Sequence, residues 1–210
     1  CGLDAGDAVD VVLEPEGPQR DDLATDVAAA LTDDPSAGEF FDSLGMLYTF
    51  VTYHLGFAPF EEGTVMALAA CGGDTYRAKF SEVVHLAEDG QFALNREYLR
   101  HDCYGQINPF TRKFHETFGP PRQRDEPITD RHRDLAFALQ ATTEDVVLHV
   151  ARALAATHPS RNLCLTGGVA LNCVANAKVL EETPVTRLWV PPCASDTGAP
   201  LGSALWHYHQ

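Results

Sequence analysis

Basic residues are scarce in this chain, and their scarcity argues against one class of partner. The 210 residues include 15 Lys and Arg against 30 Asp and Glu, which gives a formal net charge of -15 at pH 7. A nucleic-acid interface needs clustered basic side chains to neutralise phosphate groups, and the sequence contains no basic stripe. We therefore expect no nucleic acid as the main partner.

Long apolar runs and cysteine pairs with metal or redox spacing are also missing. A membrane-spanning helix needs about 20 consecutive apolar residues, and neither such a run nor a signal-peptide pattern occurs. The six cysteines include no CxxC pair. We expect free thiols, with Cys164 and Cys173 packed as small apolar side chains. These observations predict a soluble, cytoplasmic protein without membrane contact.

The histidines lack the spacing that would bring two of them onto one face of a helix. A pair four residues apart can share a metal ion, because such residues lie one turn above each other. None of the nine histidines has a partner at that spacing. His207 and His209 would lie about 200° apart around a helix. We interpret them as polar ends of a surface helix.

The most informative feature that is present is the paired glycine in LCLTGGVAL, residues Leu163 to Leu171. Gly167 and Gly168 follow an apolar strand and precede a helix that we expect to begin near Val169. Two residues without side chains allow a phosphate or an adenine ring to approach the backbone, and a helix start offers free amide groups. The alternative is an ordinary strand-to-helix turn.

A second acidic turn, SDTG, follows the next apolar strand and opens a helix expected over Ala199 to His209. Loops that follow neighbouring strands of an open α/β sheet converge at one edge, where ligands bind. Asp196 could hold a metal ion there, and Asn172, one turn into its helix, could donate or accept a hydrogen bond with a ribose or base. The alternative for Asp196 is an N-cap of the last helix.

Hydrophobic periodicity predicts the remaining elements. We expect a strand at Ala8–Leu13 and helices at Asp21–Leu31, Ser43–Leu55, Thr64–Ala70 and Asp130–Thr157. Ser43 or Asp42 should cap the Ser43–Leu55 helix, and Gly56 should end it. Its buried stripe should comprise Leu44, Leu47, Tyr48, Val51 and Leu55. The stripe of the last helix should comprise Leu135, Leu139, Thr142, Val146, Val150 and Leu154.

Residues 73–127 show a weaker pattern, and we interpret them as an irregular insertion. A strand at Val83–Leu86 before a turn at Asp89–Gly90 is the clearest element in this stretch. Four basic residues also gather in it, at positions Arg112, Lys113, Arg122 and Arg124. They could approach a phosphate, or they could balance local acidic residues in an exposed loop.

Four islands of sequence carry a family resemblance. They are Ser43–Phe57, Glu61–Gly72, Arg133–Val147, and the pair CLTGGVALNCVAN and ASDTGAPLGSAL. On these motifs the chain resembles the O-carbamoyltransferases of nodulation-factor and antibiotic biosynthesis. The resemblance implies an α/β fold of the actin-like ATPase (ribonuclease H-like) type, with a mixed sheet flanked by helices.

Residues 1–210 would be a partial domain, mainly the second lobe, with the insertion at 73–127. The first lobe and the C-terminal domain of a parent chain would then be its missing partners, and Asp4, Gly6 and Asp7 would be a remnant of the turn that opens the lobe.

The same resemblance implies a function. Such enzymes use ATP and carbamoyl phosphate to make carbamoyl adenylate, then transfer the carbamoyl group to a hydroxyl of a small-molecule acceptor, with a divalent metal ion, typically iron (Fe2+), at the phosphates. It implies that Gly167, Gly168 and Asn172 contact the nucleotide and that Asp196 is a metal ligand.

Glu62 and Gly63 match the start of an EGK motif, again at the nucleotide, where Thr64 replaces the usual lysine. The resemblance assigns no catalytic residue. Since the family's two metal-binding histidines are missing, we expect the segment by itself to be inactive. The alternatives are another actin-like kinase and a non-catalytic nucleotide-binding remnant.

Overall fold

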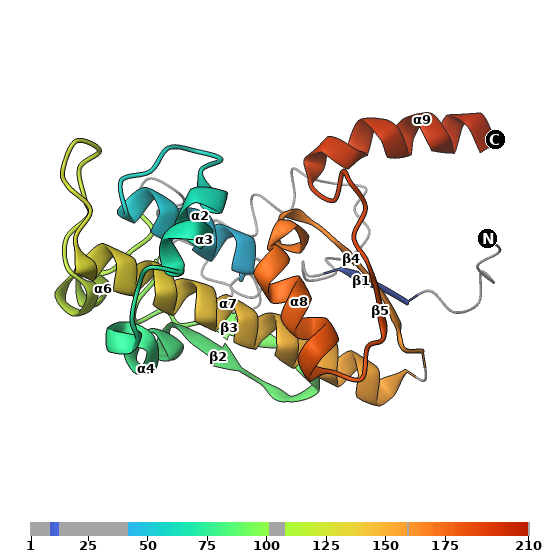
Figure 1. Ribbon diagram of the computed structural model, residues 1–210, viewed down its shortest axis with the longest axis horizontal. Helices are drawn as coiled ribbons and strands as arrows, with labels where there is room; N and C mark the ends of the chain where they lie inside the picture. Colours follow the sequence, from blue (N-terminus) through green and yellow to red (C-terminus); the bar gives the residue numbers. More distant parts are fainter. Residues whose placement is uncertain (1–8, 13–41, 101–107, 159, 210) are drawn as a thin grey trace, which may run out of the picture. The chain divides into compact units, whose positions relative to one another are not determined.

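The structure is a computed structural model that describes residues 9–12, 42–100, 108–158 and 160–209 (Figure 1). The chain divides into two compact units, Pro15–Val146 and Cys1–Glu14 with Val147–Gln210. The helix expected at Asp21–Leu31 and the turn around Asp4, Gly6 and Asp7 lie outside the described residues.

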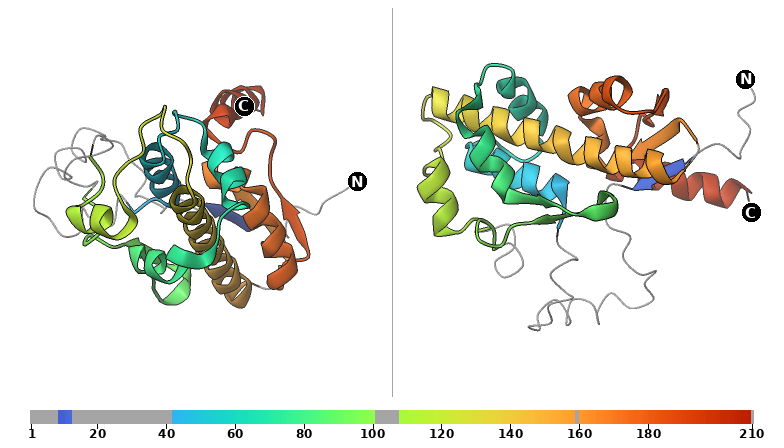
Figure 2. Two further views of the ribbon diagram at one scale, coloured as in Figure 1. Left: turned by 60° about the vertical axis from the view of Figure 1, so that its left-hand side comes forward. Right: turned by 90° about the horizontal axis from the view of Figure 1, so that it is seen from below.

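The described residues of the Pro15–Val146 unit are mainly helical. They form α2 (Leu44–His54), α3 (Glu62–Ala69), α4 (Arg77–Phe80), α6 (Arg112–Phe118) and the first part of α7 (Asp130–Thr157). Strands β2 (Val84–Leu86) and β3 (Phe92–Leu94) form an antiparallel hairpin in which Val84 pairs with Leu94. Figure 2 shows the hairpin beside these helices from two further sides. The predicted strand before the Asp89–Gly90 turn is confirmed.

Helix α2 has the boundaries that its sequence predicts. The Ser43 side chain caps the helix by accepting a hydrogen bond from the Met46 amide at 3.2 Å. After the helix, Gly56 has a φ of +75°, and a Cβ at this position would lie 2.6 Å from the carbonyl oxygen of Arg122. Glycine is therefore required both by the backbone and by the close approach. The five residues of the predicted stripe are all buried.

The aromatic part of this unit's core comes largely from the segment interpreted as irregular. Phe80, Tyr98, Phe114 and Phe118 are fully buried, and the rings of Phe110 and Phe114 stack with centroids 3.8 Å apart. Burying an aromatic side chain removes a large apolar area from water. Residues 73–127 are thus more regular than predicted, because their large side chains fill a core that local periodicity does not reveal.

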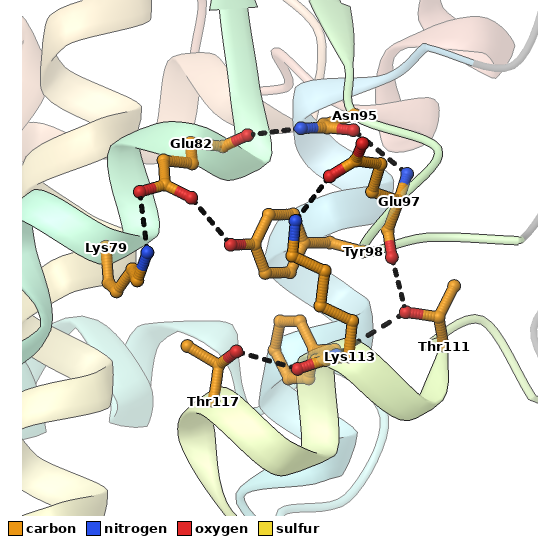
Figure 3. Close-up of polar contacts among 9 residues, drawn as sticks. Lys79, Glu82, Asn95, Glu97, Tyr98, Thr111, Lys113 and Thr117 are labelled. Carbon is orange, nitrogen blue, oxygen red and sulfur yellow. Dashed lines mark hydrogen bonds and ion pairs between the residues drawn. The ribbon is translucent and has the colours of Figure 1, made fainter.

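A polar network surrounds the buried Tyr98 ring (Figure 3). The Tyr98 hydroxyl donates to Glu82 at 2.7 Å, and Lys79 pairs with the same carboxylate at 2.9 Å. Lys113 lies over the Tyr98 ring at 4.3 Å and pairs with Glu97. The network ties α4, the turn after β3 and α6 together.

Basic residues of this segment serve the fold. Arg112 forms an ion pair with Glu116 at 3.2 Å, and Lys113 forms one with Glu97. For Arg112 and Lys113, the structure thus agrees with the alternative that these basic residues balance local acidic ones. Arg122 is buried, and its guanidinium donates to backbone carbonyls, including that of Leu55 at 2.6 Å. Arg122 therefore anchors the segment after α6 to the end of α2.

The other unit contains a three-stranded sheet in the order β1-β4-β5, formed by Val9–Val12, Asn162–Thr166 and Arg187–Trp189. Both strand pairs are parallel, with Val9 opposite Leu163 and Leu163 opposite Leu188. Parallel neighbours need a crossover, which α8 (Cys173–Glu182) provides between β4 and β5. The expectation of a mixed sheet is wrong for the described strands, because the antiparallel pair forms a separate hairpin.

Packing in this unit is less complete. Ala151 and Leu154 of α7 line a small apolar crevice with Leu163 and Val185. Helix α9 (Ala199–His209) extends away from the sheet, and none of its residues is buried (Figures 1 and 2). His207 and His209 are exposed on it, as predicted.

The burial of two cysteines and the apolar character of the helices bear on two further predictions. Cys164 is half-buried, but Cys173 is exposed at the first position of α8, so its predicted core role is wrong. Among the described residues, no helix is both long and apolar enough to cross a bilayer.

Candidate functional site

The glycine loop follows the last residue of β4, Thr166. Gly167 has a φ of +89°, and a short 3-10 helix over Gly168–Leu171 leads to α8, which begins at Cys173 and not near Val169 as predicted. The reason is the Asn172 side chain, whose Oδ1 accepts a hydrogen bond from the Ala175 amide at 3.1 Å. Asn172 is therefore the N-cap of α8 and does not lie one turn inside the helix.

The two glycines differ in what requires them. A Cβ on either Gly167 or Gly168 would meet no protein atom within 4 Å. The positive φ of Gly167 disfavours any other residue, whereas neither backbone conformation nor packing requires glycine at position 168. The open space beside Gly168 is what a ligand that approaches the backbone would use.

The second loop meets the first at a single carbonyl group. The Ala194 oxygen accepts hydrogen bonds from the Gly167 amide at 2.6 Å and from the Thr166 hydroxyl at 3.1 Å. The predicted convergence of the two loops is therefore confirmed. In this contact the Gly167 amide donates to Ala194 and is therefore not one of the free amide groups of the loop.

Asp196 begins a 3-10 helix over Asp196–Gly198 and is exposed. Since α9 begins at Ala199, Asp196 does not occupy the position before that helix, and the N-cap alternative is wrong. The turn is tight, because a Cβ on Gly198 would lie 2.4 Å from the Cys193 carbonyl oxygen. The turn thus presents the Asp196 carboxylate to solvent two residues beyond the contact at Ala194.

A complete metal site is not formed by the residues that the structure describes. Within these ranges, no group of three or more His, Cys, Asp or Glu side chains could hold an ion. Protein sites for transition metals such as zinc and non-heme iron usually have at least three side-chain ligands. Asp196 by itself therefore does not complete a site for the expected ion within the described residues.

Glu62 and Gly63 lie at the start of α3, in the Pro15–Val146 unit. The helix begins at Glu62, two residues before the predicted Thr64, and Glu61 Oε2 accepts from the Ala58 amide at 2.6 Å. Thr49 on α2 donates to Glu62 Oε1 at 2.8 Å. Gly63 is exposed, and a Cβ there would meet no atom within 4 Å.

The end of α3 is fixed as firmly as its start. Asp134 on α7 accepts from the Gly73 amide at 2.7 Å and from the Thr75 hydroxyl at 2.6 Å. A Cβ on Gly72 would lie 2.1 Å from the Arg133 carbonyl oxygen, so this turn packs directly on the helix backbone. Contacts with α2 and α7 therefore hold the helix that carries Glu62.

Sequence reasoning missed a buried network of polar side chains that joins α2 to α7. The Tyr48 hydroxyl donates to Gln140 Oε1 at 3.0 Å, and Gln140 Nε2 donates to Glu144 Oε1 at 2.8 Å. Burial, followed by the negative charges of Glu144 and Glu62, raises the pKa of Tyr48. The phenol therefore stays neutral and remains a donor. Polar residues four apart on a buried helix face, Gln140 and Glu144, were the available signal.

A buried histidine pair was also missed. The rings of His54 and His115 stack with centroids 5.5 Å apart, and neither ring nitrogen of His54 has a hydrogen-bond partner among the described residues. Burial, then the charges of His115 and Arg131, lower the pKa of His54 to about 3. His54 is thus neutral near pH 7 and belongs to the aromatic core. Its position on the face of the predicted buried stripe, three residues after Val51 and seven after Leu47, was the available signal.

Comparison with known proteins places this sequence in a family. The family model described as Carbamoyltransferase N-terminus matches residues 27–205. The chain belongs to the carbamoyltransferase N-terminal family. The match includes α3, the glycine loop and the SDTG turn of this carbamoyltransferase N-terminal chain.

Individual relatives agree with this assignment. An uncharacterised protein of Synechocystis is 38% identical over 174 residues, which cover 81% of this chain and 28% of the relative. The nodulation protein NolNO of Sinorhizobium fredii is 35% identical over 78% of this chain and 22% of its own length. The nodulation protein NolO of Bradyrhizobium diazoefficiens is 33% identical, over 78% and 28%. The carbamoyltransferase N-terminal chain therefore spans less than a third of each of these relatives.

Proposed function

We propose that this chain supplies the nucleotide-binding part of an ATP-dependent O-carbamoyltransferase, built on an actin-like ATPase fold. The whole enzyme would form carbamoyl adenylate from carbamoyl phosphate and ATP and would transfer the carbamoyl group to a hydroxyl of a small-molecule acceptor. Membership of the carbamoyltransferase N-terminal family and the likeness to two nodulation proteins support this proposal.

The observation that carries the proposal is the junction at Ala194. It brings the glycine loop after β4 and the Asp196 turn after β5 to the same edge of a parallel sheet. Ligands of open α/β sheets bind at the carboxyl ends of the strands. The space beside Gly168 would let a phosphate or an adenine ring approach the backbone without meeting a side chain.

The site residues have different proposed roles. Gly167 shapes the loop through its positive φ, Gly168 gives access to the nucleotide, and Asn172 contacts it from the start of α8. Glu62 and Gly63 contribute from α3. An ionised carboxylate only accepts hydrogen bonds, so Glu62 should contact hydroxyl or amine groups of the nucleotide and avoid its phosphates.

Asp196 is the proposed ligand of a divalent metal ion, with iron as the proposed metal. Such an ion, when bound, offsets the negative charge of phosphate groups. The described residues supply only part of its ligand set, and we assign no step of the reaction to it.

The proposed chemistry fixes which products leave. Water releases inorganic phosphate from carbamoyl phosphate and leaves carbamate, whose oxygen then attacks the α-phosphorus of ATP and releases pyrophosphate. The acceptor hydroxyl next attacks the carbamoyl carbon, which breaks the bond to the adenylate oxygen and releases AMP. The hydroxyl proton passes to solvent or to a base that the described residues do not identify.

These products define the experiment. A longer carbamoyltransferase that contains this sequence should convert ATP to AMP and pyrophosphate only when carbamoyl phosphate is present, and Asp196→Ala should abolish the conversion. Asp125→Ala, at an exposed position of the other unit, is the matched control. Formation of ADP would point to a kinase, and ATP binding without turnover would point to a non-catalytic remnant.

The 210-residue chain by itself should bind ATP weakly and transfer no carbamoyl groups. Carbamoyl transfer by this chain that is lost in Asp196→Ala would contradict the expectation.

A further inference from the structure

We propose that Thr166 is a positioning residue, which holds the Asp196 turn against the glycine loop. The inference rests on the proposed function, because it concerns the geometry of the nucleotide site. The Thr166 hydroxyl and the Gly167 amide donate to the same Ala194 oxygen, at 3.1 Å and 2.6 Å. Residues 166 and 167 are adjacent in sequence, so the two bonds form a double attachment between the loops.

The attachment lies where the sheet no longer holds the two segments. The ladder between β4 and β5 ends with Cys164 opposite Trp189. The chain then passes through a Pro-Pro sequence, at Pro191 and Pro192, before it returns to the end of β4 at Ala194. Since proline has no amide hydrogen, these two residues cannot extend the ladder by donating to β4. The Ala194 junction therefore sets where the following Asp196 turn lies.

The Ala194 carbonyl is buried, but it keeps one donor when the Thr166 hydroxyl is removed. Ala194 is 3% exposed, and a buried carbonyl without a partner is destabilising. The Gly167 amide would still satisfy that oxygen if the Thr166 hydroxyl were removed. We therefore expect loss of the hydroxyl to loosen the junction without unfolding the unit.

The same pair of strands offers a matched control at its opposite end. The Thr186 hydroxyl donates to the Arg161 carbonyl oxygen at 3.5 Å, before β5 begins. Thr186→Val removes the same group as Thr166→Val but at the amino ends of the strands. Thr166→Ser restores the donor without the methyl group.

The test is an NMR titration of the labelled 210-residue chain with ATP and Mg²⁺, a method that measures weak affinities. Thr166→Val should weaken ATP binding about fivefold, the effect of one lost hydrogen bond of ordinary strength. Thr166→Ser should bind within about twofold of the unsubstituted chain, and Thr186→Val should bind like it. Amide exchange at Gly167 should become faster only in Thr166→Val.

Four outcomes would overturn the inference. Unchanged ATP affinity in Thr166→Val, with or without faster exchange, would show that the junction does not position the site. An equal loss in Thr166→Ser would show that the methyl group matters and the donor does not. An equal loss in Thr186→Val would show a general effect on the sheet. If the unsubstituted chain does not bind ATP, the proposed function fails, and this inference fails with it.

If Thr166→Val does not fold, Thr166→Ala is measured in its place, with the same expected loss and the same serine control.

Discussion

The two units of the chain hold their candidate binding residues in different ways. In the Pro15–Val146 unit, α3 and the turn after it are held by hydrogen bonds to α2 and α7. Among the residues that the structure describes in this unit, only Phe60 and Leu86 are large apolar side chains left exposed. The other unit exposes many more, namely Leu171, Val174, Leu180, Trp189, Leu201, Leu205, Trp206 and Tyr208. A side-chain hydrogen bond from Thr49 holds Glu62, whereas glycine geometry and hydrogen bonds to the Ala194 carbonyl hold the loops around Gly167 and Asp196.

Because of this difference, substitutions in the two units should affect different properties, the stability of the fold in one and ligand binding in the other. Core substitutions in the first unit should lower the free energy of unfolding, because closely packed rings cannot rearrange to fill a void. Loop substitutions in the second unit should change ligand affinity with smaller effects on unfolding. Three predictions test the comparison, from the largest expected effect to the smallest.

The largest effect should come from truncating the aromatic core. Phe114 is fully buried and contacts Phe110 and Phe118, with ring centroids 3.8 and 4.7 Å away. Phe114→Ala should lower the free energy of unfolding by about 3–5 kcal/mol, through lost burial and a residual cavity. Urea denaturation measures this change.

Trp206→Ala, on a helix of the other unit where Trp206 is 70% exposed, should change unfolding by less than about 0.5 kcal/mol. Phe60→Ala, at a 96% exposed phenylalanine, is the matched control within the same unit as Phe114. A large loss of stability in Trp206→Ala would show that α9 is packed in solution, and the contrast between the units would disappear.

An intermediate effect should depend on pH. The pKa of His54 is lowered to about 3 by burial, whereas an unfolded histidine titrates near its ordinary value of 6.5. Between pH 6.5 and about 3, the folded state therefore binds fewer protons than the unfolded state does. The contribution of neutral His54 to stability is complete above pH 6.5 and decreases as the pH falls toward 3. The slope for His54 should reach about 1.4 kcal/mol per pH unit.

His54→Phe places a further ring in an aromatic cluster and removes this proton uptake, so urea midpoints should vary less between pH 6.5 and 4. The exposed His85→Phe serves as control and should keep the full pH dependence. If His54→Phe loses stability with acid as steeply as the unsubstituted chain, His54 is not the group responsible.

The smallest effect on stability should separate the two glycines of the loop. Gly167→Ala forces a side chain into a backbone with a φ of +89° and should cost about 1–3 kcal/mol. Gly168→Ala meets open space and should change unfolding by less than about 0.5 kcal/mol. Its methyl group should instead weaken ATP binding.

Both measurements use the same two variants, so each is the control for the other. Unchanged ATP affinity in Gly168→Ala would mean that the space beside this residue is not used by the nucleotide. Equal stability of Gly167→Ala and the unsubstituted chain would mean that the loop can adopt another conformation.

Periodic segments were predictable from the sequence because their signals are local. The boundaries of α7 and α9 agree with the prediction, and the Ser43 cap and Gly56 end of α2 are confirmed. The start of α8 was misplaced because a 3-10 turn and the cap at Asn172 compete with an earlier helix start. The aromatic core at Phe80, Phe114 and Phe118 was missed because these rings gather from separate segments.

The family and the identity of its glycine and SDTG motifs were determined by the sequence itself, since short backbone motifs depend on residues close together in the chain. Only the tertiary structure decided that Ala194 joins the two loops, that the Gly167 amide is used in that junction, and that Thr49 holds Glu62. Each of these contacts links residues far apart in sequence, and their geometry depends on how strands and helices pack, which no local pattern encodes.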